Sequence, residues 1–222
     1  MIPLYDTARR RRLPLVTWLL IAANIAIFVY EVGFSPAALE RFIRTWGLVP
    51  AQLFAQPQIE WVTILSSMFL HGGWLHILSN MWVLFIFGDN VDARMGSIKY
   101  LVFYLLSGTA AGLLQTFILP SSQTPMIGAS GAVAGVLGAY LVLFPRSRVA
   151  SLVPIFFIFT IVEIPAFIYL LFWFLSQLYS GWLSIQGGTG SGIAWWAHIG
   201  GFVFGLFMSF VFANRRTTYR SC

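Results

Sequence analysis

Charged side chains are scarce in this chain. Lys, Arg, Asp and Glu make up 9% of its 222 residues, against roughly 25% in an ordinary soluble domain. Hydrophobic residues make up 59%, and the mean hydropathy is +0.82. There are too few polar side chains to cover a soluble globule of this length, so much of the surface must face lipid. The composition excludes a conventional water-soluble fold and indicates a membrane protein.

The chain also lacks a pair of cysteines and the basic face expected of a nucleic-acid-binding domain. The single cysteine, Cys222, excludes an intrachain disulfide and leaves the redox compartment open. The net charge is +6, but the basic residues separate apolar runs instead of indicating a basic face on a folded surface, so we expect no nucleic-acid partner. Four arginines at 9–12 precede a first apolar run that lacks a small-residue cleavage site. We interpret that run as a retained span and not as a signal peptide.

Apolar runs bounded by proline, glycine and charge predict an all-α membrane protein with six transmembrane helices. The fifth run is long and contains Pro154, Glu163 and Pro165, so it is expected to tilt or kink. We expect a basic tail over 1–13, a six-helix domain over 14–213 and a second tail over 214–222. The predicted spans are 14–32, 74–87, 98–119, 127–144, 152–179 and 193–212.

The basic residues predict an orientation. Six spans place both termini on one side, and only Arg41 and Arg44 then lie on the other side. The positive-inside rule makes the richer side cytoplasmic. With no added soluble domain or targeting peptide, we expect a bacterial inner (plasma) membrane. The basic residues on the cytoplasmic side are Arg9, Arg10, Arg11, Arg12, Arg94, Lys99, Arg146, Arg148, Arg215, Arg216 and Arg220.

The first external loop contains the signal of an amphipathic helix. Ser35 is suited to the N-cap and Pro36 to the first helical position. The charged residues that follow fall away from an apolar stripe, so the helix is expected to lie at the outer interface of the bilayer. The stripe consists of Leu39, Phe42, Ile43 and Trp46.

Four polar residues fall at a similar predicted depth in three different spans. Ser130 lies just inside the outer start of the fourth span, and His198 lies about five residues inside the sixth. His76 and Asn80 share one face near the outer end of the second span, because they are four residues apart. Polar side chains inside a membrane are costly and mark function or packing. Their common depth therefore predicts a site near the outer face.

These residue types suit acyl transfer. Ser130 offers a hydroxyl nucleophile, His198 a base, and the other two residues donors that could stabilise an oxyanion. Small residues on both helices would let the backbones approach closely enough for Ser130 and His198 to hydrogen-bond. The small residues of span four are Gly131, Ala134, Gly135 and Gly138, and those of span six are Gly201 and Gly205.

An acidic third member is harder to find. Glu163 alone among the acidic residues falls well within a predicted span, near its middle, which favours a Ser-His dyad. Its own role stays open between a proton path and a structural acid. His71 is interpreted as structural. His71 and His76 lack the spacing of a zinc protease, so we expect no metal and no cofactor.

The combined motifs resemble those of the rhomboid intramembrane serine proteases over about residues 60–212. They are Gly128-Ala-Ser130-Gly131, His198 followed by Gly201 and Gly205, and the run from His71 to Asn80. The resemblance implies Ser130 as nucleophile, His198 as base, and His76, Asn80 and the Ser130 backbone N–H as the oxyanion site. It also implies a water-filled cavity open to the outer side, with lateral substrate access near spans two and five.

Two positions depart from that family's pattern. Ala134 stands where members often have an aromatic residue that stacks on the catalytic histidine, so another group, Trp195 or Trp196, must flank His198. The first loop shows Trp61-Val-Thr63 in place of a Trp-Arg pair. The aromatic run 172–174 is interpreted as facing lipid and gating substrate access.

The leading hypothesis is a serine endopeptidase that cuts membrane-protein substrates in or near a transmembrane segment. One alternative is a catalytically silent relative that binds transmembrane segments. Another is a channel or transporter, which would need polar residues continued through the membrane.

Overall fold

Four helices of the chain are long and apolar enough to cross a membrane. The computed structural model describes residues 1–8, 13–155, 158–186 and 192–214. Within them, the four helices are 18 to 22 residues long, which matches the length needed to span the hydrocarbon core of a bilayer. They are α1 (Leu15–Val32), α8 (Ser97–Ile118), α10 (Ala166–Ile185) and α11 (Trp195–Phe212).

A bent pair of segments forms a fifth candidate span. A continuous helical stretch runs through α6 (Trp74–Val83), the π-helical turn η2 (Leu84–Gly88) and α7 (Asp89–Met95). The short α5 (Thr63–Ser66) and η1 (Ser67–Phe69) precede it at an angle of 94°. The break between them contains His71 and Gly73.

The helix that starts at Ser130 is short but central. Helix α9 (Ser130–Leu143) has 14 residues, fewer than the roughly 20 of a typical span. Its residues from Gly131 to Tyr140 are all buried, and it packs against α8, α11 and η2. By length, the described residues therefore hold four or five spans, and the sixth stays a prediction.

The prediction of a fifth span over 152–179 is wrong in its first half. Residues there form the antiparallel hairpin of β2 (Arg148–Ile155) and β3 (Ile158–Pro165), and α10 begins only at Ala166. The run is rich in β-branched and aromatic residues, which favour strands. Pro165 directly precedes α10, where its fixed φ suits a helix start. The fold is thus mostly helical but not all-α.

The same correction applies to Glu163. It lies on β3 opposite Ala150, and its side chain is exposed. It is therefore not a carboxylate in the middle of a transmembrane helix, and the hypothesis of a proton path through it is wrong.

The N-terminal residues add a third strand. Strand β1 (Ile2–Asp6) pairs antiparallel with β2, which gives the sheet order β1-β2-β3. Trp82 Nε1 donates to the Pro3 carbonyl at 2.6 Å, and Asn90 Nδ2 and the Tyr140 hydroxyl donate to the Asp6 carboxylate. Part of the stretch predicted as a tail is therefore attached to α6, α7 and α9.

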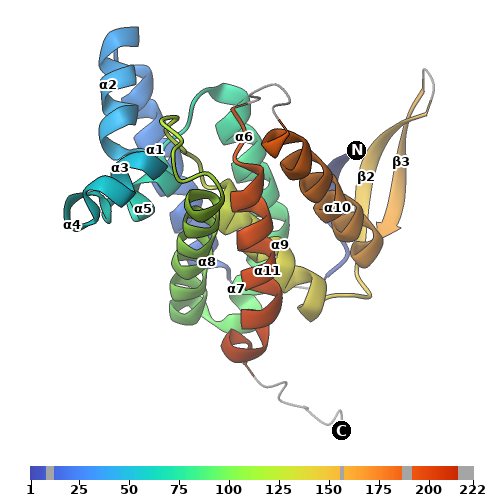
Figure 1. Cartoon of the computed structure of the whole chain (residues 1–222). Coiled ribbons are helices and arrows are strands. Elements are labelled where there is room, and N and C mark those ends of the chain that lie inside the picture. Colours follow the sequence, from blue (N-terminus) through green and yellow to red (C-terminus); the bar gives the residue numbers. More distant parts are fainter. Residues whose placement is uncertain (9–12, 156–157, 187–191, 215–222) are drawn as a thin grey trace, which may run out of the picture.

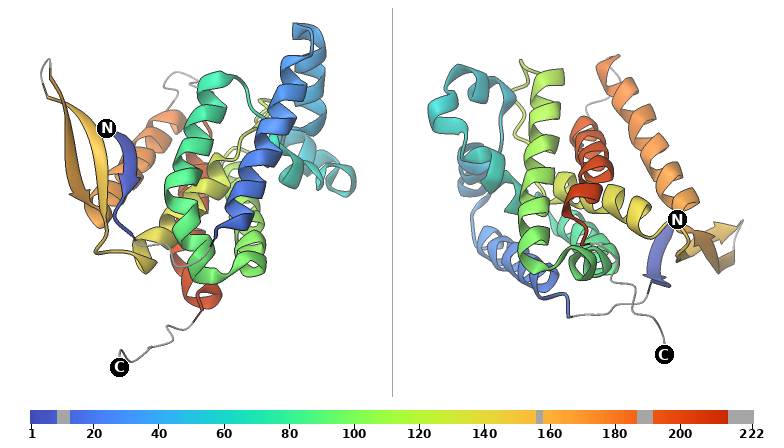
Figure 2. Two further views of the ribbon diagram at one scale, coloured as in Figure 1. Left: turned by 180° about the vertical axis from the view of Figure 1, so that it is seen from behind. Right: turned by 90° about the horizontal axis from the view of Figure 1, so that it is seen from below.

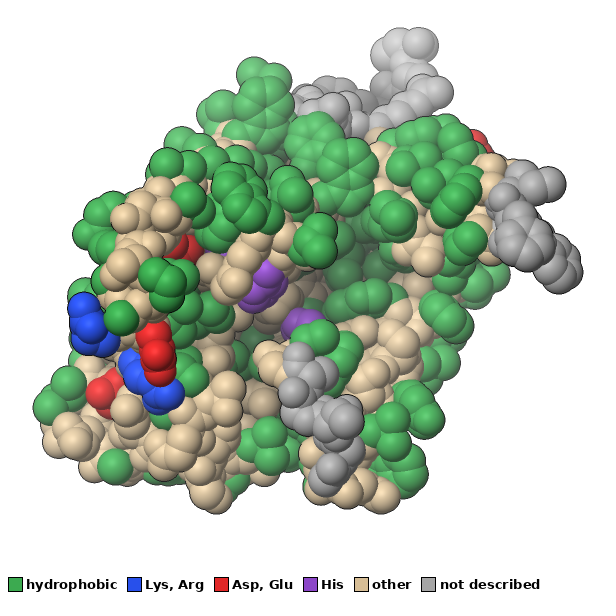
Figure 3. Space-filling model, turned by 90° about the horizontal axis from the view of Figure 1, so that it is seen from above, with side chains coloured by type: hydrophobic (Ala, Val, Ile, Leu, Met, Phe, Trp, Pro, Cys, Tyr) green, Lys and Arg blue, Asp and Glu red, His purple; other side chains and the backbone are tan. Residues whose placement is uncertain are grey.

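The sheet and the first-loop helices lie on opposite sides of the helical bundle (Figures 1 and 2). In Figure 1, α8 and α10 flank the central α11, and α2 and the end of α11 lie at opposite ends of the molecule. The face seen from above carries many hydrophobic side chains around a hollow (Figure 3). Large exposed apolar residues also follow the outer side of α10, as expected of a surface that meets lipid. They include Phe167, Leu171, Phe172, Leu175 and Tyr179.

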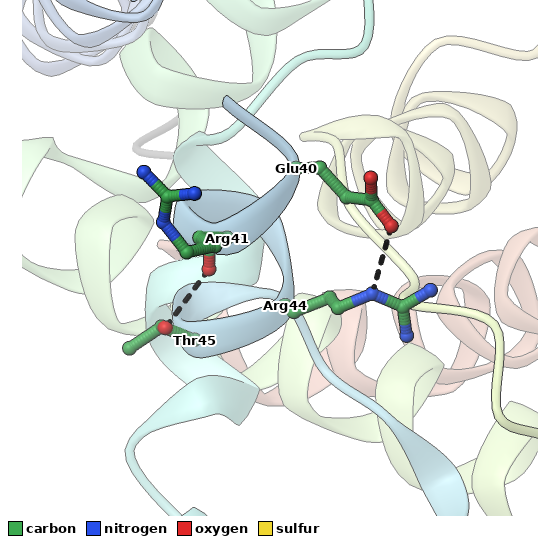
Figure 4. Close-up of polar contacts among 4 residues, drawn as sticks. All are labelled: Glu40, Arg41, Arg44 and Thr45. Atoms are coloured by element: carbon green, nitrogen blue, oxygen red, sulfur yellow. Dashed lines mark hydrogen bonds and ion pairs between the residues drawn. The ribbon is translucent and has the colours of Figure 1, made fainter. Parts of the chain in front are cut away.

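The first loop folds into three short helices, α2 (Pro36–Trp46), α3 (Pro50–Ala55) and α4 (Pro57–Glu60). Ser35 Oγ accepts a hydrogen bond from the Ala38 N–H at the start of α2. Phe42 packs against Tyr30 at the end of α1, and Glu40 pairs with Arg44 on the exposed face (Figure 4). The placement of α2 at a bilayer interface stays a prediction.

Candidate active site

Glycines bring α9 and α11 into direct backbone contact. A Cβ atom added to Gly201 would overlap the Gly131 carbonyl oxygen, and one added to Gly205 would overlap the Gly135 carbonyl oxygen. On the other side of α9, a Cβ on Gly131 would lie 2.6 Å from Ala111 Cβ. These glycines are the small residues that the sequence assigned to close packing, and only a residue without a side chain fits at these contacts.

This close approach joins Ser130 to His198. Ser130 is the first residue of α9, and His198 lies in the first turn of α11. Ser130 Oγ lies 2.8 Å from His198 Nε2, within the range of a strong hydrogen bond. Two residues separated by 68 positions therefore meet as a hydroxyl and an imidazole.

The other ring nitrogen of His198 has a partner that sequence reasoning missed. His198 Nδ1 lies 2.8 Å from Oε1 of Gln177 on α10. A polar glutamine within an apolar helix was the available signal. The sequence reasoning expected an acidic third group and therefore does not include this glutamine.

Two tryptophans flank the His198 ring. The ring centroids of Trp195 and Trp173 each lie 6.0 Å from that of His198. Trp195 was one of the two sequence candidates, whereas Trp196 lies against Gly181 on α10. The interpretation of residues 172–174 as facing lipid is wrong for Trp173, whose ring lies beside that of His198, and for Phe174, whose ring stacks on the buried Phe202.

His76 and Asn80 face the same space from α6. Nδ1 of His76 accepts a hydrogen bond from the Gly72 N–H at 3.3 Å. Gly128 has a φ of +119°, and a Cβ there would lie 2.6 Å from His76 Nε2, so glycine is required for both backbone and space. Asn80 is buried, and its Nδ2 has no hydrogen-bond partner among the described residues.

His71 anchors the turn before α6. Its backbone N–H donates to the Glu31 carboxylate of α1 at 3.1 Å, and both residues are buried. Its ring lies edge-on to that of His76, with centroids 5.1 Å apart. The contact of Glu31 with this turn could not be read from the sequence.

A cavity of about 560 Å³ is lined by Ser130 and His198 together with His76 and Asn80. Seen from above, histidine side chains are visible in the hollow of Figure 3. The cavity therefore opens toward the end of the molecule that carries α2. Within the part of the chain that the structure describes, no group of three or more His, Cys, Asp or Glu residues could hold a metal ion. The lining includes Met68, His76, Asn80, Gly128, Ser130 and His198.

Comparisons with known proteins agree on one family. The chain is 33% identical over 136 residues to Rhomboid protease GluP of Bacillus subtilis (strain 168), covering 61% of this chain and 26% of that protein. It is 32% identical over 174 residues to RHOMBOID-like protein 4 of Arabidopsis thaliana, covering 78% of this chain and 39% of that protein. The chain thus spans well under half of the length of these relatives. A family model described as "Rhomboid domain" matches residues 58–215, and the chain belongs to the Rhomboid family.

Proposed function

We propose that this chain is an intramembrane serine endopeptidase that works through a dyad of Ser130 and His198. The observation that carries the proposal is the 2.8 Å contact between Ser130 Oγ and His198 Nε2 at the wall of an open cavity. A hydroxyl beside an imidazole base is the arrangement that activates a serine for attack on a carbonyl. Two relatives carry the word protease in their names, Rhomboid protease GluP and Putative rhomboid protease YdcA.

In the proposed reaction, Ser130 Oγ attacks the carbonyl carbon of the scissile bond while His198 Nε2 takes the hydroxyl proton. The tetrahedral intermediate then collapses, and His198 returns the proton to the leaving amine. Water attacks the resulting acyl-enzyme, with His198 again as base, and regenerates the Ser130 hydroxyl. The Ser130 proton therefore leaves with the amine, and water supplies the second proton that His198 returns to Ser130 Oγ.

We assign oxyanion stabilisation to Asn80, His76 and the Ser130 backbone N–H. The unpartnered Nδ2 of Asn80 supports this role, because a buried amide without a partner is ready to donate to a developing charge. His76 supports it as well, because the Gly72 N–H occupies its Nδ1 and leaves Nε2–H as the free donor of the neutral ring.

The proposed substrates are membrane proteins cut in or near a transmembrane segment. The backbone around the scissile peptide bond must be extended for the serine to reach its carbonyl carbon. Segments with small or helix-breaking residues should therefore be preferred. The family resemblance suggests lateral access near α6 and α10. We place both termini on the cytoplasmic side of the membrane, on the distribution of basic residues.

A silent binder of transmembrane segments is the alternative of a different class. It has no physical need for a hydroxyl–imidazole contact, an unpartnered amide and a second histidine in one cavity. A channel would need polar residues through the whole membrane, and a liposome ion-flux assay separates that function from proteolysis.

The test is cleavage of a panel of single-span substrates by the purified chain in detergent. Ser130→Ala should abolish cleavage and labelling by a fluorophosphonate probe, while the thermal unfolding midpoint stays near that of the wild type. Ser209→Ala is the matched control, because Ser209 lies on α11 and its hydroxyl donates to Leu206 within the same helix. Undiminished cleavage by Ser130→Ala would contradict the proposal.

A further inference from the structure

The side-chain amide of Gln177 has a fixed direction. Ser176 Oγ donates its hydrogen to the Trp173 carbonyl at 2.6 Å, so the hydroxyl oxygen is left to accept. Gln177 Nε2 lies 2.9 Å from Ser176 Oγ and 3.3 Å from the Trp173 carbonyl oxygen. Both neighbours are therefore acceptors, and the NH₂ end of the amide must face them.

The opposite orientation of the amide would be unfavourable. It would bring Gln177 Oε1 against the Trp173 carbonyl oxygen, so that two acceptors would face each other. Gln177 is only 6% exposed, so water is not available to relieve that contact. The network of α10 thus directs Oε1 toward His198.

The direction of the amide determines which ring nitrogen of His198 carries the proton. Because Gln177 Oε1 can only accept, the hydrogen bond of 2.8 Å requires a hydrogen on His198 Nδ1. In the neutral ring, Nε2 is then unprotonated and can accept the hydrogen of Ser130 Oγ, 2.8 Å away. This is the tautomer that a general base for Ser130 needs.

We infer that Gln177 is a positioning residue that holds His198 in the Nδ1–H tautomer, so that the chain works with a Ser130–His198–Gln177 arrangement and not with an unassisted dyad. The inference rests on the proposed function for its catalytic meaning, but the tautomer can be measured without any substrate. During attack the ring becomes an imidazolium, and its Nδ1–H bond to Gln177 becomes charge-assisted and stronger. Gln177 should therefore affect the chemical step more than substrate binding.

The first measurement uses the wild-type protein. The chain has three histidines, so a ¹⁵N-histidine NMR spectrum in detergent can be assigned by comparison with His71→Gln, His76→Gln and His198→Gln. We expect a protonated Nδ1 and an unprotonated Nε2 for His198 at neutral pH. A protonated Nε2 in the wild type would overturn the inference, whether or not the chain is a protease.

The second measurement uses Gln177→Met, which keeps much of the volume and removes the amide acceptor. We expect the His198 spectrum to show mixed tautomers and kcat to fall about 10- to 100-fold, as for loss of a hydrogen bond to a charged group, with KM little changed.

A matched control is Gln115→Met. Gln115 is also buried and hydrogen-bonded to α11, but its Oε1 accepts from the Ala197 backbone N–H at 3.2 Å. The Gln115→Met substitution should lower thermal stability without changing the His198 spectrum. The inference would be overturned if Gln177→Met kept the wild-type tautomer and kcat. It would also be overturned if Gln115→Met changed the His198 spectrum as much as Gln177→Met does. Loss of activity in Ser130→Ala separately tests the proposed function.

Discussion

At the scale of single residues, the site depends on glycines, because glycine has no side chain to keep two helices apart. Ser130 and His198 meet because the two helices that carry them touch through backbone atoms at Gly131 and Gly201. A side chain at this contact would separate the helices, and a hydrogen bond weakens steeply once its atoms leave their narrow range of distance.

We therefore predict that Gly201→Ala lowers both stability and activity. The added methyl group would overlap the Gly131 carbonyl oxygen, and overpacking of this kind costs about 1 to 3 kcal/mol or more. The thermal unfolding midpoint and the rate of fluorophosphonate labelling of Ser130 should both fall. Gly33→Ala is the control, because Gly33 is exposed and has a φ of −73°. Unchanged labelling in Gly201→Ala would contradict the close contact.

At the scale of secondary-structure elements, β1 links the start of the chain to the helices behind the site. Asp6 accepts hydrogen bonds from Asn90 on α7 and Tyr140 on α9, and both donors are buried. Removal of the carboxylate would leave two buried donors without this acceptor, which is a costly loss.

Asp6→Ala should therefore lower the free energy of unfolding by about 1 to 3 kcal/mol. Glu40→Ala removes the carboxylate of the ion pair with Arg44, in which both side chains are more than half exposed. This substitution should change the free energy of unfolding by less than about 0.5 kcal/mol. Denaturant titration of both variants in the same detergent measures the difference. Equal effects would show that the Asp6 contacts contribute no more than an exposed ion pair.

At the scale of the whole molecule, described basic residues lie near both ends of the bundle. Arg94 and Lys99 donate to the backbone carbonyl and side-chain oxygens of Asn214, just beyond the end of α11. Arg41 and Arg44 lie on α2, at the opposite end of the bundle (Figure 1). The count of basic residues over the whole sequence makes the end that carries Asn214 the expected cytoplasmic one, and this orientation stays a prediction.

The single cysteine allows a direct test of this orientation. In intact right-side-out bacterial spheroplasts, a membrane-impermeant maleimide should not label Cys222 until the membrane is permeabilised. The double variant Arg41→Cys, Cys222→Ser should be labelled without permeabilisation. Labelling of Cys222 in intact spheroplasts would contradict the proposed topology.

The sequence determined the residues of the candidate site and the helices that carry them. Ser130, His198, His76 and Asn80 could be selected because polar groups are rare and costly in an apolar chain, and helical periodicity places them at one depth. The spacing of the glycines along each helix likewise predicted close helix packing.

Only the tertiary structure decided what surrounds those residues. Gln177 and Trp173 reach His198 because α10 packs beside α11, and no local pattern in the sequence encodes that pairing. The hairpin replaced half of a predicted span, because hydropathy alone does not distinguish an apolar strand from an apolar helix. Contacts between residues far apart in the sequence depend on how the elements pack, and local periodicity carries no information about that packing.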